Sequence, residues 1–362
     1  MNNKKIKAIE GLRTIGWLGI FFCHFKGAFW NNLPLLTKAP PPLMFLYSGN
    51  SYVRLLFVIS GFVIAFKFFT KPIDYNQAKF DIIKRYFRLM PTIFVAEFLV
   101  FLLMKIGILK NAEVAKIVGS ENFLGIFNQF TPSIFLFFKE SLFGTYLLGS
   151  SAYIGPLWTM NYEYLGTIYV IVACYFLSRS RVRWIFYLVN FLFFSNYWNY
   201  FIIGMATCDL FTNVDWKIIF ERHKAVHFIF TAFGYLLFTC CNLNDTNKSS
   251  RFFFALGIMM FLLGFLNCSF AEKYFGSKFF CFGGKIAYSA YVIHWPIIET
   301  FSCGFFLFFA DFANYNFVIC VNLVLTLFIV VFVSFFFSKY IEPIGMRFLS
   351  INSAKSSSES AP

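Results

Sequence analysis

The stretch LRTIGWLGIFFCHFKGAFW, residues 12–30, is the first long apolar run of the chain and carries Arg13 and His24 eleven residues apart. A helix has about 3.6 residues per turn, so eleven residues make close to three turns and place both side chains on one face, about 16 Å apart. Glu10, one turn before Arg13, joins that face. In a helix that crosses a membrane with Arg13 at the cytoplasmic surface, His24 lies near the middle of a hydrocarbon core about 30 Å thick.

An ionisable side chain at that depth indicates a functional site. Placing a charged residue at the bilayer centre costs at least about 2.5–3.5 kcal/mol, so such residues are rare in membrane helices unless they act there. The alternative is a neutral imidazole that hydrogen-bonds to a neighbouring helix. The alignment of Arg13 and Glu10 with His24 favours function. Cys23 precedes His24, but adjacent helical residues do not face each other, so the two do not form a catalytic pair.

The composition is that of a membrane protein. Of 362 residues, 59% are hydrophobic and 13% are charged, which is too apolar for a soluble domain of this length. The net charge of +14 would suit nucleic acid, but Lys and Arg gather between apolar runs, as at 84–88 and 179–183. That distribution is typical of cytoplasmic loops and predicts contact with a lipid bilayer, not with nucleic acid. The nine cysteines are scattered without a CxxC pair, so we expect neither a metal site nor a disulfide framework.

Ten apolar segments predict the fold: residues 12–30, 51–69, 89–109, 156–177, 183–196, 198–212, 226–242, 252–270, 286–309 and 315–338. We expect an all-α, polytopic integral membrane protein with about ten transmembrane helices. Most Lys and Arg then fall in loops on the side of the N-terminus, so both termini are predicted to be cytoplasmic, in a bacterial inner (plasma) membrane. Residues 1–343 are the predicted membrane domain, and residues 344–362 a short, disordered cytoplasmic tail rich in Ser.

Two predicted outer segments are longer than simple turns. Residues 31–50 contain Pro34 and three further prolines at 40–42, so we expect them to be irregular. Residues 110–155 contain an apolar stretch, 134–148, that is interrupted by a lysine and a glutamate, and we interpret this stretch as interfacial or re-entrant.

A basic cluster precedes the third apolar segment: KRYFRLMP, residues 84–91. Arg85 and Arg88 are three residues apart and are neighbours on one helical face. Two adjacent guanidinium groups suit phosphate because each presents a planar fork of donors. An ordinary anchor at the membrane surface is the alternative. Pro91 fits the first turn of the membrane helix that follows.

Glu163 is the clearest intramembrane carboxylate, since it lies more than one turn inside the fourth apolar segment. A carboxylate at that depth requires an Arg or His partner, or a bound proton. A salt bridge with Arg13 and a catalytic role are both compatible with this position. Glu97 in the third segment is a further candidate of the same kind.

His294 and the pair at 60–61 have simpler interpretations. His294 follows Tyr291 by one turn in the ninth segment, just before Pro296, which is expected to kink the helix. We interpret His294 as a structural hydrogen-bonding residue. Ser60 and Gly61 allow another helix backbone to approach closely, so they predict a packing contact.

Six short segments occur in a distinctive order: IEGLR at 9–13 with His24 after ten further residues, LFVISGF at 56–62, RYFR at 85–88, LWTMNYEY at 157–164, YSAYVIHWP at 288–296 and EP at 342–343. Together they resemble the acyltransferase 3 family of membrane-bound acyltransferases, over almost the whole chain. The resemblance implies transfer of an acyl group, usually acetyl from acetyl-CoA, to a hydroxyl of an extracytoplasmic polysaccharide or glycolipid.

A mechanism follows as a hypothesis. The phosphates of acyl-CoA are expected at three basic residues near the inner surface: Arg13, Arg85 and Arg88. His24 then acts as general base on the acceptor hydroxyl, or carries the acyl group itself as a transient nucleophile. Glu163 or Glu10 orients its imidazole.

A different class of function stays open. A transporter or exporter could use the buried His and Glu residues as a proton relay. Against this, no inverted repeat is evident in the sequence, and the basic pair suits a nucleotide-bearing donor. A membrane scaffold without chemistry would leave the aligned Arg13 and His24 unexplained.

Overall fold

The computed structural model describes residues 6–30, 48–193, 197–240 and 248–350, and within these ranges the chain is helical and has no strand. The chain forms two compact units. The first comprises Met1–Ile20, Pro34–Ile82 and Leu165–Lys285, and the second comprises Phe21–Leu33, Ile83–Tyr164 and Ile286–Pro362. Four helices have residues in both units: α1 (Lys7–Phe29), α5 (Tyr75–Lys105), α8 (Thr159–Leu177) and α15 (Lys278–Ile297).

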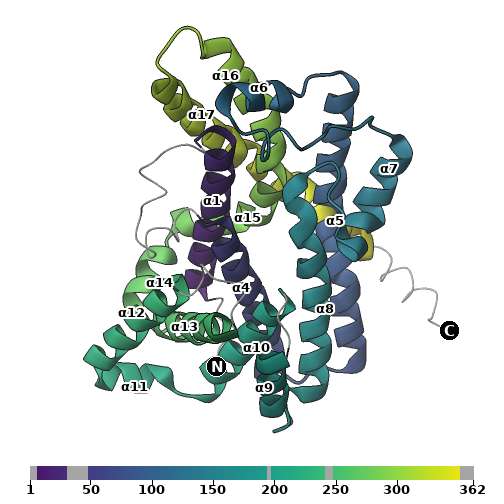
Figure 1. Ribbon diagram of the computed structural model, residues 1–362. Helices are drawn as coiled ribbons and strands as arrows, with labels where there is room; N and C mark the ends of the chain where they lie inside the picture. The colour runs from purple at the N-terminus through teal and green to yellow at the C-terminus, as the bar shows by residue number, and fades with distance from the viewer. Residues whose placement is uncertain (1–5, 31–47, 194–196, 241–247, 351–362) are drawn as a thin grey trace, which may run out of the picture. The chain divides into compact units, whose positions relative to one another are not determined.

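The first unit is built on helix pairs that meet at glycines. Its own helices are α4 (Gly49–Thr70), α9 (Arg183–Phe193), α10 (Trp198–Asn213), α11 (Trp216–Arg222), α12 (Lys224–Cys240), α13 (Lys248–Leu266) and α14 (Ser269–Phe275). α4 packs along α10 (Figure 1), and a Cβ atom on Gly61 would overlap the carbonyl oxygen of Phe201. A Cβ atom on Gly204 would likewise overlap the carbonyl oxygen of Val58. The packing contact predicted at 60–61 is therefore confirmed, with α10 as its partner.

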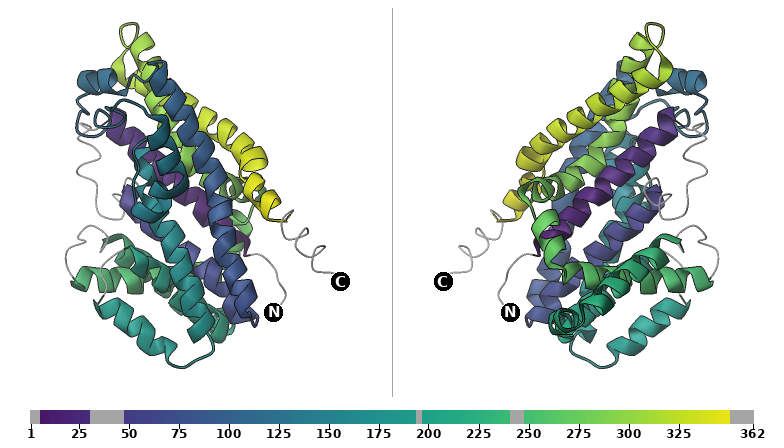
Figure 2. Two further views of the ribbon diagram at one scale, coloured as in Figure 1. Left: turned by 90° about the vertical axis from the view of Figure 1, so that its right-hand side faces the viewer. Right: turned by 90° about the vertical axis from the view of Figure 1, so that its left-hand side faces the viewer.

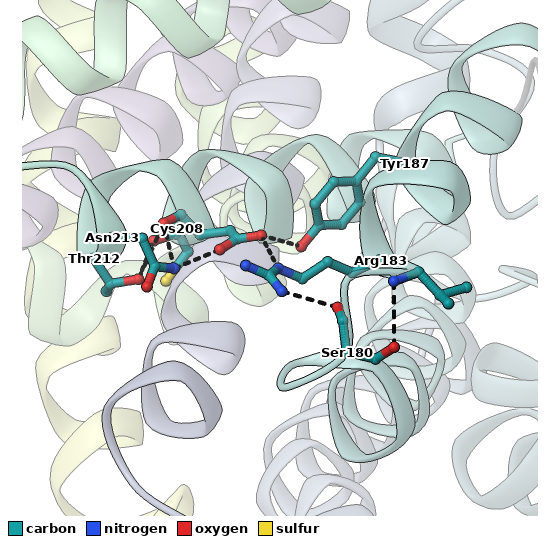
Figure 3. Close-up of polar contacts among 8 residues, drawn as sticks. Ser180, Arg183, Tyr187, Cys208, Thr212 and Asn213 are labelled. Carbon is teal, nitrogen blue, oxygen red and sulfur yellow. Dashed lines mark hydrogen bonds and ion pairs between the residues drawn. The ribbon is translucent and has the colours of Figure 1, made fainter.

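A buried ion pair joins α9 to α10 in the same unit. Asp209 is fully buried, and its Oδ2 lies 2.6 Å from Nε of Arg183. The hydroxyl of Tyr187 donates to Oδ2 over 3.2 Å, and the side-chain amide of Asn213 donates to Oδ1 over 2.6 Å. Figure 3 shows Arg183 and Tyr187 approaching this carboxylate from α9, and Asn213 from α10. Arg183, grouped by the sequence with the basic loop at 179–183, is thus largely an interhelical residue.

In the second unit, the buried side of α17 (Tyr315–Phe336) carries polar side chains. The unit's own helices are α6 (Asn111–Val118), α7 (Ile134–Lys139), η2 (Glu140–Leu148), η3 (Gly155–Trp158), η5 (Ile298–Ser302), α16 (Cys303–Phe309), α17 and η6 (Phe337–Ile341). α16 and α17 form a hairpin (Figure 2). The hydroxyls of Ser302 and Thr326 lie 2.6 Å apart, and the amide of Asn322 donates to the Ser302 carbonyl oxygen over 3.0 Å. The other side of α17 exposes large apolar side chains, as expected of a helix that faces lipid: Phe317, Val324, Phe328 and Phe332.

Each of the ten predicted segments coincides with a helix, but ten membrane spans are not confirmed. Four of the described helices are long and apolar enough to cross a membrane: Gly49–Thr70, Tyr75–Lys105, Lys278–Phe309 and Tyr315–Ser350. A fifth results if Ser250–Leu266 and Ser269–Phe275, bent by 81°, count as one span. α1 carries Glu10, Arg13 and His24, which lower its hydropathy, and α9 has only 11 residues. The long apolar helices are those expected of an integral membrane protein.

The first part of the predicted disordered tail is helical. The prediction places it from residue 344 onward, whereas residues 343–350 are helical. Phe348 on this last helix stacks on Phe87 of α5, with ring centres 5.8 Å apart, and this contact orders the segment. Residues 351–362, and 31–47 of the predicted irregular outer segment, lie outside the described residues.

α5 also differs from its prediction. The sequence places Pro91 in the first turn of a helix, but α5 begins at Tyr75 and holds Pro91 in its interior. The stretch 134–148 forms α7 followed by the π-helix η2, and it packs on α5 through the rings of Phe137 and Phe94, 5.0 Å apart. Tertiary packing, and not local sequence alone, therefore decides where these helices begin and end.

Gly61→Ala tests the contact between α4 and α10. The added methyl group overlaps backbone that cannot move aside, so we expect a loss of about 1–3 kcal/mol in the free energy of unfolding. Gly304→Ala is the matched control, because a Cβ there meets no atom within 4 Å. Thermal unfolding of both variants in detergent measures the difference. Equal stability of the two would contradict the contact.

Asp209→Ala tests the buried ion pair. Removing one partner leaves the largely buried Arg183 guanidinium without its counter-charge, which should lower the free energy of unfolding by about 2–4 kcal/mol. Glu221→Ala provides the comparison, since it breaks the exposed pair of Lys217 and Glu221, which should matter by no more than about 1 kcal/mol. Denaturant unfolding of both variants should therefore differ clearly. An Asp209→Ala protein as stable as the Glu221→Ala protein would rule out this role.

Candidate active site

His24 on α1 and His294 on α15 form a directly hydrogen-bonded pair within the second unit. Nδ1 of His24 lies 2.7 Å from Nε2 of His294. The ring planes are within 8° of each other and the ring centres are 5.0 Å apart, so the rings meet edge to edge in nearly one plane. His294 is 1% exposed, whereas His24 is partly exposed.

The partners of His294 determine which nitrogen of His24 remains available. Nδ1 of His294 lies 2.7 Å from the carbonyl oxygen of Tyr291 and 3.2 Å from that of Ala290. A carbonyl oxygen only accepts, so Nδ1 of His294 carries the hydrogen, and in a neutral ring its Nε2 must accept. Nδ1–H of His24 is then the donor in the pair. This assignment, deduced from the partners, leaves Nε2 of His24 with a lone pair.

Tyr291 holds this arrangement in place. Its hydroxyl lies 2.6 Å from Oγ1 of Thr159 and donates to the carbonyl oxygen of Pro156 over 2.6 Å. These bonds fix the turn of α15 whose carbonyl oxygen accepts from His294. His294 therefore has the hydrogen bonds expected of a structural residue, and in addition it orients His24.

Aromatic rings enclose one side of the pair. Trp295 meets the ring of His24 edge-on, with centres 5.4 Å apart, and Phe123 lies 6.1 Å from the same imidazole. Next to Trp295 lies Glu299, which accepts a hydrogen bond of 2.9 Å from the side chain of Asn128. The sequence analysis singled out neither Glu299 nor Asn128. The available signal for Glu299 was an acid in an apolar segment, five residues after His294.

The sequence predicted that Glu10 or Glu163 orients the imidazole of His24, but Glu10 does not do so. It lies fourteen residues before His24 on α1, about 21 Å along the helix axis, so it cannot reach the imidazole. Its carboxylate lies 3.3 Å from NH1 of Arg13. The imidazole of His24 instead makes its hydrogen bond, among the described residues, to His294.

Glu163 belongs to a different group of side chains in the second unit. It interacts electrostatically with Tyr288, whose hydroxyl donates to the carbonyl oxygen of Leu89 over 2.6 Å. Arg88 and Glu342 interact with the same tyrosine, and Nε of Arg88 lies 3.8 Å from Oε1 of Glu342. Glu163 therefore shares the surroundings of Tyr288 with Arg88 and Glu342.

Glu97 is fully buried on α5, outside the histidine pair. It accepts a hydrogen bond of 3.1 Å from Oγ1 of Thr145 on η2, and Glu140 of the same π-helix interacts with it electrostatically. The contacts of the described residues connect neither carboxyl group to His24.

The three arginines predicted to hold phosphate are divided between the units. Arg13 belongs to the first unit, and Arg85 and Arg88 belong to the second. Arg85 and Arg88 are both partly exposed and lie three residues apart on α5, as predicted. The side chain of Arg88 is 42% exposed, and its contact with Glu342 is long. A guanidinium has five donors, so Arg88 can bind an anion while it keeps this contact.

Comparison with known proteins supports the resemblance noted in the sequence. A family model described as an acyltransferase domain, of the acyltransferase 3 type, matches residues 6–341. No curated protein and no solved structure matches the chain.

Proposed function

The chain belongs to the acyltransferase 3 family, and on this premise we propose that it transfers an acetyl group from cytoplasmic acetyl-CoA to a hydroxyl of an extracytoplasmic polysaccharide or glycolipid. The family makes it a membrane acyltransferase. The observation that carries the finer proposal is the pair of His24 and His294, because it leaves Nε2 of His24 able to accept a proton. We place the protein in a bacterial inner membrane, with both termini in the cytoplasm.

In the transfer step, Nε2 of His24 accepts the proton of the acceptor hydroxyl while the hydroxyl oxygen attacks the carbonyl carbon of the thioester. The new C–O bond forms a tetrahedral intermediate, which collapses as the C–S bond breaks. The departing sulfur of CoA takes the proton from His24 and restores the neutral ring. In between, His24 is positively charged, and its Nδ1–H bond to Nε2 of His294 stabilises that charge.

A covalent route uses the same atom. Nε2 of His24 attacks the thioester carbon, the N–C bond forms, and the C–S bond breaks with release of CoA as a thiolate. The acceptor hydroxyl then attacks the acyl-imidazole, and a C–O bond forms as the N–C bond to His24 breaks. The proton of the hydroxyl leaves with the thiolate or with water, and the neutral ring is restored. Both routes require the tautomer of His24 that His294 selects.

The acyl donor carries phosphates, and the basic pair of α5 supports binding at that end. Arg85 and Arg88 present their guanidiniums from one helical face, and phosphate accepts from such planar donors. Arg13, the third residue predicted for this role, pairs with Glu10 in the first unit. Glu163 and Glu342 act on Tyr288 together with Arg88 and help to position the donor site.

A proton-relay transporter receives less support from the contacts of the described residues. A relay requires a titratable group on each side of every proton transfer. From His24 the hydrogen-bond chain runs to His294 and ends at backbone carbonyl oxygens, which cannot pass a proton onward. The arrangement orients a base more readily than it conducts protons.

His24→Ala should abolish transfer without preventing membrane insertion, because no other group replaces the base. His294→Ala should lower kcat by about 10²- to 10⁴-fold, since it frees the tautomer and rotation of His24. Release of free CoA thiol from acetyl-CoA, with candidate sugars and purified protein in detergent, measures both effects. His227→Ala is the control: His227 lies within 2.8 Å of the Gly264 carbonyl oxygen in the first unit and should not matter.

Two results would contradict the proposal. Normal activity of the His24→Ala protein would remove the assigned base. Wild-type protein that leaves acetyl-CoA intact with every sugar offered would favour a transporter instead.

A further inference from the structure

Glu299 lies beyond the histidine pair, at the point where α15 changes to the π-helix η5. Pro296 lies in this stretch and has no N–H to donate, and π-turns of this kind are frequent at functional sites. Trp295 and Glu299 are four residues apart and lie on one side of the helix. Glu299 is completely buried, and the side chain of Asn128 donates to its Oε2 over 2.9 Å.

Three polar atoms at this place lack a hydrogen-bond partner among the described residues: Oε1 of Glu299, Oδ1 of Asn128 and Nε1 of Trp295. The indole N–H of Trp295 faces the carboxyl group of Glu299 in a weak hydrogen bond outside the usual geometry, and a ligand hydroxyl can replace it. Nearly all buried polar groups in folded proteins have a partner, so three such atoms together indicate a ligand site. The set offers two acceptors and one donor.

The segment that carries Asn128 is held in a demanding conformation. Asn128 has φ of 59°, and it is the one non-glycine residue with positive φ among those the structure describes. Such a conformation persists where the surrounding contacts favour it, as around ligands. Asn128 is partly exposed, so one edge of the cluster lies at the surface of the second unit.

Aromatic rings connect this cluster to the reactive imidazole. Phe127 lies 5.0 Å from the ring centre of Trp295, and Phe123 lies 5.6 Å from it. Trp295 in turn meets the ring of His24 at 5.4 Å. A ligand bound to Glu299 therefore shares one indole wall with His24.

We propose that Glu299, Asn128 and Trp295 bind the acceptor and recognise two neighbouring hydroxyl groups of a sugar ring. Each hydroxyl donates one hydrogen bond and accepts others, which matches two acceptors and one N–H donor. The apolar face of the ring packs on the aromatic wall. Asn128 lies in the predicted outer segment, and Glu299 lies five residues beyond His294 toward the outer end of its predicted span, on the side from which an extracytoplasmic acceptor arrives. The inference rests on the proposed function, whose acceptor it describes.

Glu299→Gln keeps nearly the same shape but replaces an acceptor with a donor. The oxygen of the new amide keeps the hydrogen bond from Asn128, so its N–H group takes the position at which Oε1 accepts. We expect the acceptor KM to rise about tenfold to a hundredfold, as for loss of a hydrogen bond to a charged group, with the KM for acetyl-CoA unchanged. The probes are a methyl hexopyranoside and its monodeoxy analogues. Wild-type protein should prefer the parent sugar over an analogue that lacks one of the recognised hydroxyls, and the variant should lose that preference.

Two further variants keep the test independent of folding. Glu140→Gln makes the same change at a buried carboxyl group whose described contacts do not reach His24, and it should leave acceptor KM unchanged. Asn128→Gly removes the amide while it suits the positive φ, so it should raise acceptor KM without strain.

A binding measurement separates this inference from the proposed function. Saturation-transfer NMR with the same methyl hexopyranoside, without acyl donor, should show binding to wild type and to Glu140→Gln, and its loss in Glu299→Gln. If wild type binds the sugar in this way but releases no CoA, the site stands and the proposed acetyl transfer fails. If Glu299→Gln and Asn128→Gly retain wild-type binding and wild-type sugar preference, or if wild type binds no sugar, the inference is overturned.

Discussion

The hydrogen bond of 2.7 Å between His24 and His294 is the interaction on which the rest of the site depends. One imidazole alone would be free to exchange tautomers and to rotate. A second imidazole, fixed at its far nitrogen by the carbonyl oxygen of Tyr291, determines where the proton of the first one lies. In a catalytic triad, a carboxylate orients the imidazole that acts as the base. Here a second imidazole orients His24, and a backbone carbonyl oxygen fixes that second imidazole.

The surrounding helices explain why this geometry holds in an apolar environment. Tyr291 is tied to Thr159 and to the Pro156 carbonyl oxygen, so the turn of α15 that supports His294 cannot shift alone. The π-helix that follows brings Glu299 beside Trp295. Further along the chain, hydrogen bonds join η5 to α17. Such bonds hold helices together in lipid, where the hydrophobic effect does not drive helix association. Nε2 of His24, the proposed base, therefore lies on a helix fixed by buried polar contacts.

Periodicity and composition were sufficient to predict the helical class, the position of each apolar segment and the close contact at Gly61. They were insufficient for the partner of His24, because His294 lies 270 positions away and only the fold brings the two together. For the same reason Glu163 and Glu10, which match the expected pattern in sequence, have other neighbours in space. Arg183 lies in a basic segment typical of a surface loop, but its side chain pairs with the buried Asp209. The sequence does not show that Arg183 is an interhelical residue, because only the fold brings Asp209 beside it.

Solid-state ¹⁵N NMR of the protein in lipid bilayers tests the central claim most directly, because the chemical shift of each imidazole nitrogen reports whether it carries a hydrogen. The chain has four histidines, so spectra of the His24→Ala protein assign the signals. The account predicts that at neutral pH His24 is neutral, with hydrogen on Nδ1 and none on Nε2, and that His294→Ala allows both tautomers. A His24 ring with hydrogen on Nε2, or one whose tautomer does not respond to the loss of His294, would contradict it.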